Sequence, residues 1–403
     1  MMYRKFMILI LSLACYAYFT QWSIMYFLFL SLLIIFSNRT ENKPLRKSVG
    51  IISVVSLIAG FVLLKSAFTR NVVLGYSVFA FCGISFVVDL FKTGKRYDVL
   101  DILLFLFFFP KMLAGPIIRI ECFCRQLAVK TTCKQTVYKG IKLLIYACFL
   151  KFIVTDIALD RDMNGTGFNL FVQTIIWGIR FYIDFYAYSL IAVGLALLVG
   201  VQLPYNFENP YSALSFRDFW HRWNITLTKW LSEYVYIPLG GSRCTTICTY
   251  MNVVITFIVS GLWHGMTLSF VMWGICHGIF VCIERLFHSD KKDEVVKWTY
   301  RIFVVLVTMF LWQLFRLNDF GEVADFAKQL SSTTKIDGTT VIYGGGACLL
   351  LCLIEAPITK RLMLGNEDSQ CNVICEVSVL SIMLAVMILC PFHFTFNFFY
   401  LRF

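Results

Sequence analysis

Charged residues are scarce in this sequence. Only 15% of its 403 residues are Asp, Glu, Lys or Arg, whereas soluble domains carry about 25%. Hydrophobic residues make up 59%, and the mean hydropathy is +0.74. A chain with so little charge cannot cover the surface of a soluble globular protein. We therefore expect the lipid bilayer to surround most of it.

The sequence also lacks the common catalytic and cofactor patterns. It contains no G-x-S-x-G, H-E-x-x-H, Walker or Rossmann pattern. Most of its 15 Cys lie inside apolar runs, where a thiol behaves as a small hydrophobic group. Cys122/Cys124, Cys244/Cys248 and Cys371/Cys375 lack the paired C-x-x-C spacing of a zinc site. We interpret the cysteines as free structural thiols, and we expect no metal and no bound cofactor.

The net charge of +12 comes from short basic loops between apolar runs. These loops hold Arg39, Lys43, Arg46 and Lys47; Lys92, Lys95 and Arg96; Lys130, Lys134, Lys139 and Lys142; and Lys291, Lys292 and Lys297. This is the positive-inside pattern of a protein that crosses the membrane several times. It is not the continuous basic stripe of a nucleic-acid-binding protein, so we expect no nucleic-acid partner.

Apolar runs long enough to cross about 30 Å of hydrocarbon recur along the whole chain. They are Phe6–Phe36, Val49–Phe68, Val72–Phe91, Ile102–Ile118, Ile141–Leu159, Leu170–Ile183, Tyr188–Leu203, Met251–Trp263, Leu268–Leu286, Ile302–Leu317, Val341–Ile358 and Val373–Cys390. The first run, Phe6–Phe36, is one long helix or a hairpin of two, and we expect it to remain uncleaved. The sequence shows no internal repeat and no linker between domains. We therefore predict that residues 1–403 form one all-α membrane domain of about ten to twelve spans.

One amphipathic segment, residues 215–243, stands out. On a helical wheel at about 100° per residue, its large apolar side chains fall on one face and its cations fall away from it. The apolar face holds Phe216, Phe219, Trp220, Trp223, Leu227, Trp230, Leu231 and Tyr234. The S-x-x-D pattern at Ser215 predicts the start of the helix, and Pro238 with the Gly240-Gly241 pair predicts its end. We expect this helix to lie along a membrane surface.

Two other apolar segments are interrupted. In FFFPKMLAGPIIR, residues 107–119, Pro110 and Pro116 predict a broken or re-entrant helix, or a helix end followed by a turn. Further on, Arg180 and Asp184 lie four residues apart within apolar sequence, on one helix face. Charges inside a membrane protein usually pair, so we expect a structural Arg180–Asp184 ion pair rather than direct catalytic work.

His264 is the leading candidate for chemistry. It lies between two apolar runs, flanked by Gly261 and Gly265, which permit the close approach of another backbone or a ligand. A neutral imidazole in a dry cavity can act as a general base toward a hydroxyl, although a packing role is open as well. Asn224 can donate an amide hydrogen bond to a carbonyl oxygen. A general base and such a donor together predict acyl transfer. His277 does not share a face with His264, and we interpret it as structural.

Several motifs resemble those of the membrane-bound O-acyltransferase (MBOAT) family. They are FRDFWHRWNITLTKWLSEYVYIPLGGSR, SGLWHG, a following W-G-x-x-H-G, FFFPKMLAGPIIR, IDFYAYSLIAVGLALLVGVQLPYNFENPY and the closing FNFFYLRF. They lie within residues 107–403 and are most similar to the branch that contains alginate O-acetylases and the D-alanine transfer proteins of teichoic acids.

The resemblance implies roles for particular residues. The family's essential histidine falls on His264, and its second marked position falls on Asn224, where this branch carries a histidine and many others an asparagine. Further candidates for substrate binding or for lining a tunnel are Trp223, Arg222, Trp263, Ser260 and His221. His221 is also the residue that could compensate for the missing second histidine.

The resemblance further implies a helical bundle with amphipathic or re-entrant helices around a central tunnel. An acyl donor, acetyl-CoA or an acyl-carrier thioester, would enter from the cytoplasm, and an extracytoplasmic SGNH-type partner would often complete the transfer. We therefore predict an O-acetyltransferase of the bacterial cytoplasmic membrane that acts on an exported polysaccharide or on peptidoglycan. The alternatives are D-alanyl transfer to teichoic acid, which the run Tyr236–Arg243 disfavours, and a transporter or flippase component.

Overall fold

The structure is a computed structural model that describes residues 2–65, 75–112, 115–128, 133–160, 162–286, 293–317, 319–365 and 370–390. Within these ranges every regular element is a helix and no strand is present, which confirms the predicted all-α class. The closing aromatic segment, residues 396–403, lies outside the described residues, as do Lys130, Lys291 and Lys292 of the predicted basic loops.

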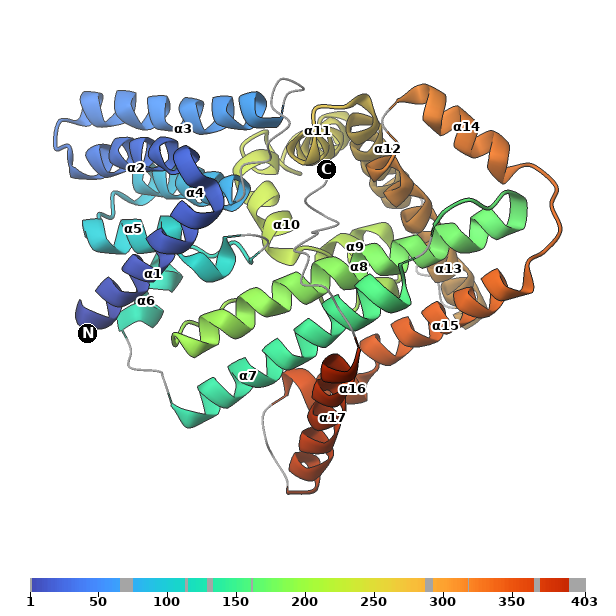
Figure 1. Ribbon diagram of the computed structural model, residues 1–403. Coiled ribbons are helices and arrows are strands. Elements are labelled where there is room, and N and C mark those ends of the chain that lie inside the picture. The colour runs from blue at the N-terminus through green and yellow to red at the C-terminus, as the bar shows by residue number, and fades with distance from the viewer. Residues whose placement is uncertain are drawn as a thin grey trace. The chain divides into compact units, whose positions relative to one another are not determined.

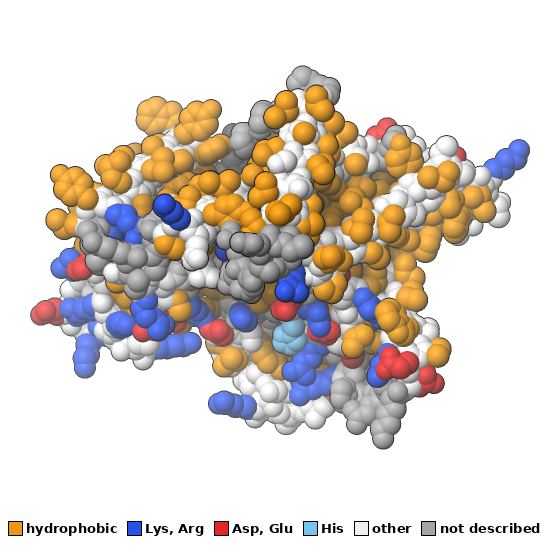
Figure 2. Space-filling view, turned by 90° about the horizontal axis from the view of Figure 1, so that it is seen from below, with side chains coloured by type: hydrophobic (Ala, Val, Ile, Leu, Met, Phe, Trp, Pro, Cys, Tyr) orange, Lys and Arg blue, Asp and Glu red, His pale blue; other side chains and the backbone are white. Residues whose placement is uncertain are grey.

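Eight described helical segments are long and apolar enough to cross a membrane. They are Met2–Arg39, Lys43–Leu63, Tyr76–Thr93, Gly167–Leu198, Thr246–His264, Leu268–Leu286, Glu294–Phe315 and Gly338–Glu355. The predicted number was higher, partly because the runs Leu170–Ile183 and Tyr188–Leu203 form one continuous helix, α8 (Gly167–Leu198). Large apolar side chains cover much of the surface seen in Figure 2. The chain is therefore an integral membrane protein, since such a surface is stable in lipid and not in water.

The chain forms two compact units, residues 1–144 with 188–205, and residues 145–187 with 206–403. Unit 1 contains α1 (Met2–Thr20), α2 (Ile24–Arg39), α3 (Lys43–Lys65), α4 (Tyr76–Thr93), α5 (Val99–Phe107), α6 (Ile120–Ala128), most of α7 (Lys134–Cys148) and the end of α8. The predicted single domain of residues 1–403 remains a prediction.

Within unit 1, the first apolar run and the segment 107–119 are both interrupted. A 3₁₀ turn at Gln21–Ser23, with a positive φ of 48° at Gln21, separates α1 from α2, so the first apolar run forms two helices. In the segment 107–119, α5 ends at Phe107, a 3₁₀ turn follows at Phe109–Lys111, and α6 begins only at Ile120. Proline explains the second interruption, because Pro110 lacks the N–H that would continue the helix.

Unit 2 contains the start of α8 and the rest of the chain. Its helices are a π-helical segment (Phe149–Ala158), α9 (Phe216–Arg222), α10 (Ile225–Leu231), α11 (Thr246–His264), α12 (Leu268–Leu286), α13 (Glu294–Leu311), a 3₁₀ turn (Trp312–Phe315), α14 (Phe320–Leu330), α15 (Gly338–Glu355), α16 (Pro357–Leu364) and α17 (Gln370–Leu389).

Helices α11 and α12 lie side by side and carry His264 between them (Figure 1). Glycines make their close approach possible. A Cβ added at Gly261 would lie 2.2 Å from the Phe270 carbonyl oxygen, and one at Gly274 would lie 2.4 Å from the Phe257 carbonyl oxygen. The close approach predicted at Gly261 is therefore made by the backbone of the next helix.

The charges on α8 pair differently from the prediction. Lys151 Nζ, on the π-helical segment, lies 2.7 Å from Asp184 Oδ1, with both side chains only 1% exposed. Arg180 instead pairs with Asp160 at 2.6 Å. The predicted Arg180–Asp184 pair is thus wrong in its partners. Lys151 therefore supplies the counter-charge that the buried carboxylate of Asp184 on α8 needs.

Candidate active site

The amphipathic segment begins and ends where the sequence predicted, but it is not one helix. Ser215 Oγ accepts from the Asp218 backbone N–H at 2.9 Å, so the predicted cap forms. Gly240 and Gly241 adopt positive φ values of 109° and 57° at the far end. Between them, α9 ends at Arg222 and α10 starts at Ile225, with Asn224 in the left-handed region at φ 41° and ψ 52°. The single helix predicted for residues 215–243 is therefore wrong.

An upstream residue, Asn206, holds this break in place. Its backbone oxygen accepts from the Ile225 N–H at 2.9 Å, and its Oδ1 accepts from Thr226 Oγ1 at 2.6 Å. The first bond satisfies a backbone N–H at the start of α10 that has no helical partner, and the second ties the Thr226 hydroxyl to the same residue. Asparagine tolerates the left-handed conformation better than most residues. Asn206, the first residue of the N-F-E-N-P-Y run, thus fixes the backbone on the C-terminal side of Asn224.

His264 ends α11 within a set of aromatic rings. Its ring centroid lies 4.3 Å from Trp263, 4.7 Å from Phe315, 5.3 Å from Trp273 and 6.0 Å from Phe270. The side chain is 9% exposed. Aromatic walls exclude water from one side of the imidazole, which is the environment that a general base in a membrane enzyme needs.

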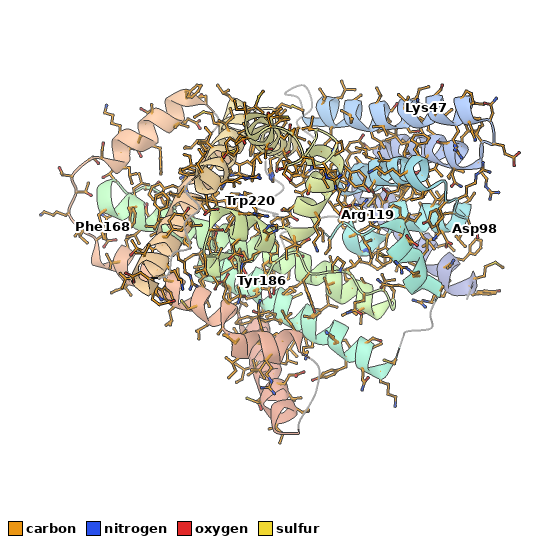
Figure 3. All side chains as sticks on the ribbon, turned by 180° about the vertical axis from the view of Figure 1, so that it is seen from behind. Lys47, Asp98, Arg119, Phe168, Tyr186 and Trp220 are labelled. Atoms are coloured by element: carbon orange, nitrogen blue, oxygen red, sulfur yellow. The ribbon has the colours of Figure 1, made fainter. Side chains whose placement is uncertain are left out.

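One cavity in unit 2 brings the two leading candidates together. It measures about 1050 Å³, and both His264 and Asn224 line it. Trp220, labelled in Figure 3, contributes to the same wall from α9. The apolar part of the lining includes Leu227, Leu231, Val253, Phe257 and Phe280. Its charged part holds three cations, Arg217, Arg285 and Lys297, and one carboxylate, Glu284, so its net charge is positive. A long apolar ligand with an anionic end fits this distribution.

The other candidates divide into two groups. Trp223, His221 and Ser260 line the cavity. Arg222 is not among its lining residues, because it bonds to Asp218 Oδ1 at 2.7 Å and lies near the Glu208 carbonyl oxygen. Trp263 is likewise absent from the lining and contacts His264 through its ring.

Two carboxylates that the sequence analysis did not single out accept hydrogen bonds from the start of α9 and from the turn before it. Glu284, on α12, accepts from the backbone N–H groups of Phe216 at 3.1 Å and Arg217 at 3.0 Å, and from Tyr300 Oη at 2.8 Å. Glu355, at the end of α15, accepts from Ser212 Oγ at 3.0 Å. A glutamate inside an apolar run is the only signal that the sequence gives for either of them.

Glu355 fixes the turn that precedes α9 at two further points. Its Oε1 accepts from the Tyr211 N–H at 3.3 Å, and its backbone oxygen accepts from Asn209 Nδ2 at 2.9 Å. The Tyr211 ring lies 6.0 Å from that of Phe219 and 6.4 Å from that of Trp223. The carboxylate of Glu355 therefore acts on the cavity wall through Tyr211.

Glu284→Ala is expected to lower the free energy of unfolding by about 1 kcal/mol, because it leaves the partly exposed backbone donors at the start of α9 without their protein acceptor. Hydrogen exchange at the Phe216 and Arg217 amides should become faster, and thermal unfolding in detergent should begin earlier. Glu294→Ala is the matched control, since its carboxylate is 73% exposed and pairs with Lys297 on its own helix. Equal effects of the two substitutions would show that the bonds from Glu284 do not stabilise α9.

The fold and the cavity define an integral membrane protein with a buried histidine and an asparagine facing one apolar chamber. The sequence matches the MBOAT, membrane-bound O-acyltransferase family over residues 6–318, and the chain belongs to this family. His264, Asn224 and the carboxylate of Glu284 lie within the matched segment, whereas Glu355 lies beyond it.

The chain is similar to several curated proteins. It is 31% identical over 257 residues to the probable alginate O-acetylase AlgI of Azotobacter vinelandii. The aligned stretch covers 61% of this chain and 51% of that protein. It is 29% identical over 310 residues to the peptidoglycan O-acetyltransferase of Helicobacter pylori, which covers 73% and 56%. It is 25% identical over 244 residues to the teichoic acid D-alanyltransferase of Streptococcus thermophilus, which covers 54% and 58%. The chain thus spans about half the length of the curated relatives that it matches.

Proposed function

We propose that this protein is a membrane O-acyltransferase that moves an acetyl group from a thioester donor toward a hydroxyl of an exported polysaccharide or of peptidoglycan. The observation that carries this proposal is that His264 and Asn224 line one cavity within the segment matched by the family. Acetyl is preferred to D-alanyl because the acetyltransferase relatives are 29–31% identical and the D-alanyltransferase 25%.

The proposed chemistry uses these two side chains in one step. The His264 imidazole takes the proton of the acceptor hydroxyl, whose oxygen attacks the thioester carbonyl carbon. The Asn224 amide donates a hydrogen bond to the carbonyl oxygen as it gains negative charge. When the intermediate collapses, the sulfur leaves and takes the proton from His264. The ester forms, the thioester breaks, and the imidazole returns to its neutral state.

The cavity also supports a donor with a long arm. Its volume of about 1050 Å³ is at the upper end of ligand pockets and far exceeds the need of an acetyl group. Arg217, Arg285 and Lys297 on its lining could hold a phosphate. Acetyl-CoA and an acyl-carrier thioester share this plan of a phosphate, an extended arm and a terminal thioester, and either is a substrate in our proposal.

The proposal extends to the protein's surroundings. The relatives come from bacteria, which supports a place in the bacterial cytoplasmic membrane. Transfer to a polymer outside that membrane would involve an extracytoplasmic SGNH-type partner, and an acyl-carrier protein on the donor side is the second partner that we propose.

The direct test compares the envelope polymers of cells that have or lack this protein. After alkaline release, chromatography separates acetate from D-alanine, and we expect only the acetate to depend on the protein. Dependence of D-alanine alone would contradict the acetyl assignment. If neither ester changed, the acyltransferase proposal would fail, and the transporter alternative would remain.

Asn224→Gly is expected to lower the rate of transfer by about 10²-fold, the usual effect of removing one oxyanion donor. Glycine keeps the left-handed backbone of residue 224 without strain, so the change isolates the amide. The measurement is acetyl transfer by purified protein in liposomes, with Lys229→Gly as an exposed control on α10. A wild-type rate for Asn224→Gly would reduce Asn224 to a residue that shapes the turn.

A further inference from the structure

Two thiols lie together at the turn that precedes α11. Cys244 precedes the cap of the helix, and Cys248 belongs to its first turn. Asn252, one turn further, donates from Nδ2 to the Gly241 carbonyl oxygen at 3.1 Å, to Cys244 Sγ at 3.5 Å and to Cys248 Sγ at 3.8 Å. One amide therefore bonds to both sulfurs, which brings them close to each other.

The two thiols also interact directly. The contacts of the Cys244 thiol with Cys248, Thr249 and Asn252 lower its pKa below its usual value. The distance from Cys244 Sγ to Thr249 Oγ1 is 3.7 Å. Both cysteines are free and only partly buried, so a reagent dissolved in water can reach them. A thiol with a lowered pKa is the better nucleophile near neutral pH.

The pair adjoins the wall of the cavity. Ser242 before it and Tyr250 and Val253 after it line the chamber that contains His264. The Gly241 backbone N–H donates to the Tyr236 carbonyl oxygen at 2.9 Å, so the turn before the cysteines also fixes a lining residue. A new covalent bond at this point would change how that wall is held.

We propose that Cys244 and Cys248 form a site of reversible disulfide formation, with small-molecule disulfides as the reagent class. The Cys244 thiolate attacks one sulfur of the reagent and expels the other as a thiolate, which takes up a proton. The Cys248 thiol then loses its proton, attacks the Cys244 sulfur and expels the second half of the reagent as a thiol. Two protein thiols and one reagent disulfide thus become one protein disulfide and two reagent thiols.

The test treats the purified protein in detergent with oxidised glutathione, followed by digestion and mass spectrometry. We expect a peptide linked through Cys244 and Cys248, lighter by two hydrogen atoms and opened again by dithiothreitol. Cys133 is the matched control, because hydrogen bonding to Thr136 also lowers its pKa while no described cysteine is paired with it. Cys133 should retain glutathione as a lasting adduct.

The variant Cys248→Ser sharpens the test, because it should convert Cys244 into a site with a lasting glutathione adduct. Wild-type protein that keeps glutathione on Cys244, links it to another cysteine or does not react there would overturn the proposal. None of these readouts depends on acyl transfer, so they fail or succeed independently of the proposed function.

A second arm rests on the proposed function. Transfer of acetyl should fall several-fold in the linked protein and return with dithiothreitol, and Cys248→Ser should show no such cycle. Unchanged transfer in fully linked protein would overturn the effect on the cavity wall.

Discussion

His264→Ala should lower the rate of acyl transfer by about two to four orders of magnitude, the usual contribution of a positioned general base. The imidazole lines the same cavity as Asn224, and in our proposal it alone takes the proton of the attacking hydroxyl. The assay is acetyl transfer by purified protein in liposomes, with the amount of folded protein matched by size-exclusion chromatography. His264→Gln should be equally slow, because an amide keeps polarity and much of the volume but cannot accept the proton.

His221→Ala is the matched control for that experiment. His221 lines the same cavity from α9, but its side chain is exposed and lies outside the aromatic set around His264. Its loss should leave the rate within a few-fold of wild type. Normal surface acetylation by His264→Ala in properly inserted protein would refute the catalytic assignment. A large loss with His221→Ala would move the second catalytic role from Asn224 to His221.

Lys151→Met should lower the free energy of unfolding by about 3–5 kcal/mol, because it leaves a buried carboxylate without its cation. Asp184 is 1% exposed, and its Oδ1 lies 2.7 Å from Lys151 Nζ. The double substitution Lys151→Met with Asp184→Leu should recover part of the loss, since it removes the buried pair. Recovery is incomplete because Asp156 Oδ1, which lies 2.8 Å from Lys151 Nζ and is 29% exposed, also loses its cation. Thermal unfolding in detergent, followed by tryptophan fluorescence, measures both effects.

Lys297→Met is the control for the buried pair. Lys297 and Glu294 lie 2.6 Å apart but are 37% and 73% exposed, and exposed pairs contribute only about 0–1 kcal/mol. A melting temperature for Lys151→Met equal to that of Lys297→Met would mean that Asp184 does not depend on its partner. Failure of the double variant to recover would indicate that the charges are needed for folding.

Local signals in the sequence predicted much of the candidate site. The cap at Ser215 and the turn at Gly240-Gly241 depend on residues within one or two turns of each other, and Gly261 next to His264 indicated a close backbone approach without naming its partner. Such features follow from the hydrogen-bonding capacity and the size of side chains, and both properties can be read from the residue types in the sequence. The all-α membrane class follows in the same way from composition.

What the sequence could not give depends on partners far along the chain. The wheel fitted one helix to residues 215–243, because one left-handed residue at Asn224 hardly disturbs an apolar period. The acceptor for the next backbone N–H, that of Ile225, is the carbonyl oxygen of Asn206. Asp184 had a near neighbour of opposite charge in Arg180, yet it pairs with Lys151, 33 residues away. Tertiary packing chose between these partners, and helical spacing does not encode that choice.

The hydrogen bonds from Glu355 have a consequence for recombination between relatives. Residues 209–212 lie inside the family-matched segment 6–318, whereas their acceptor lies beyond it, on α15. The C-terminal helix α15 therefore takes part in fixing the turn before α9. A chimera that takes this helix from another protein keeps the turn before α9 in place only if it supplies a carboxylate where Glu355 stands, since Asn209, Tyr211 and Ser212 all donate to that residue.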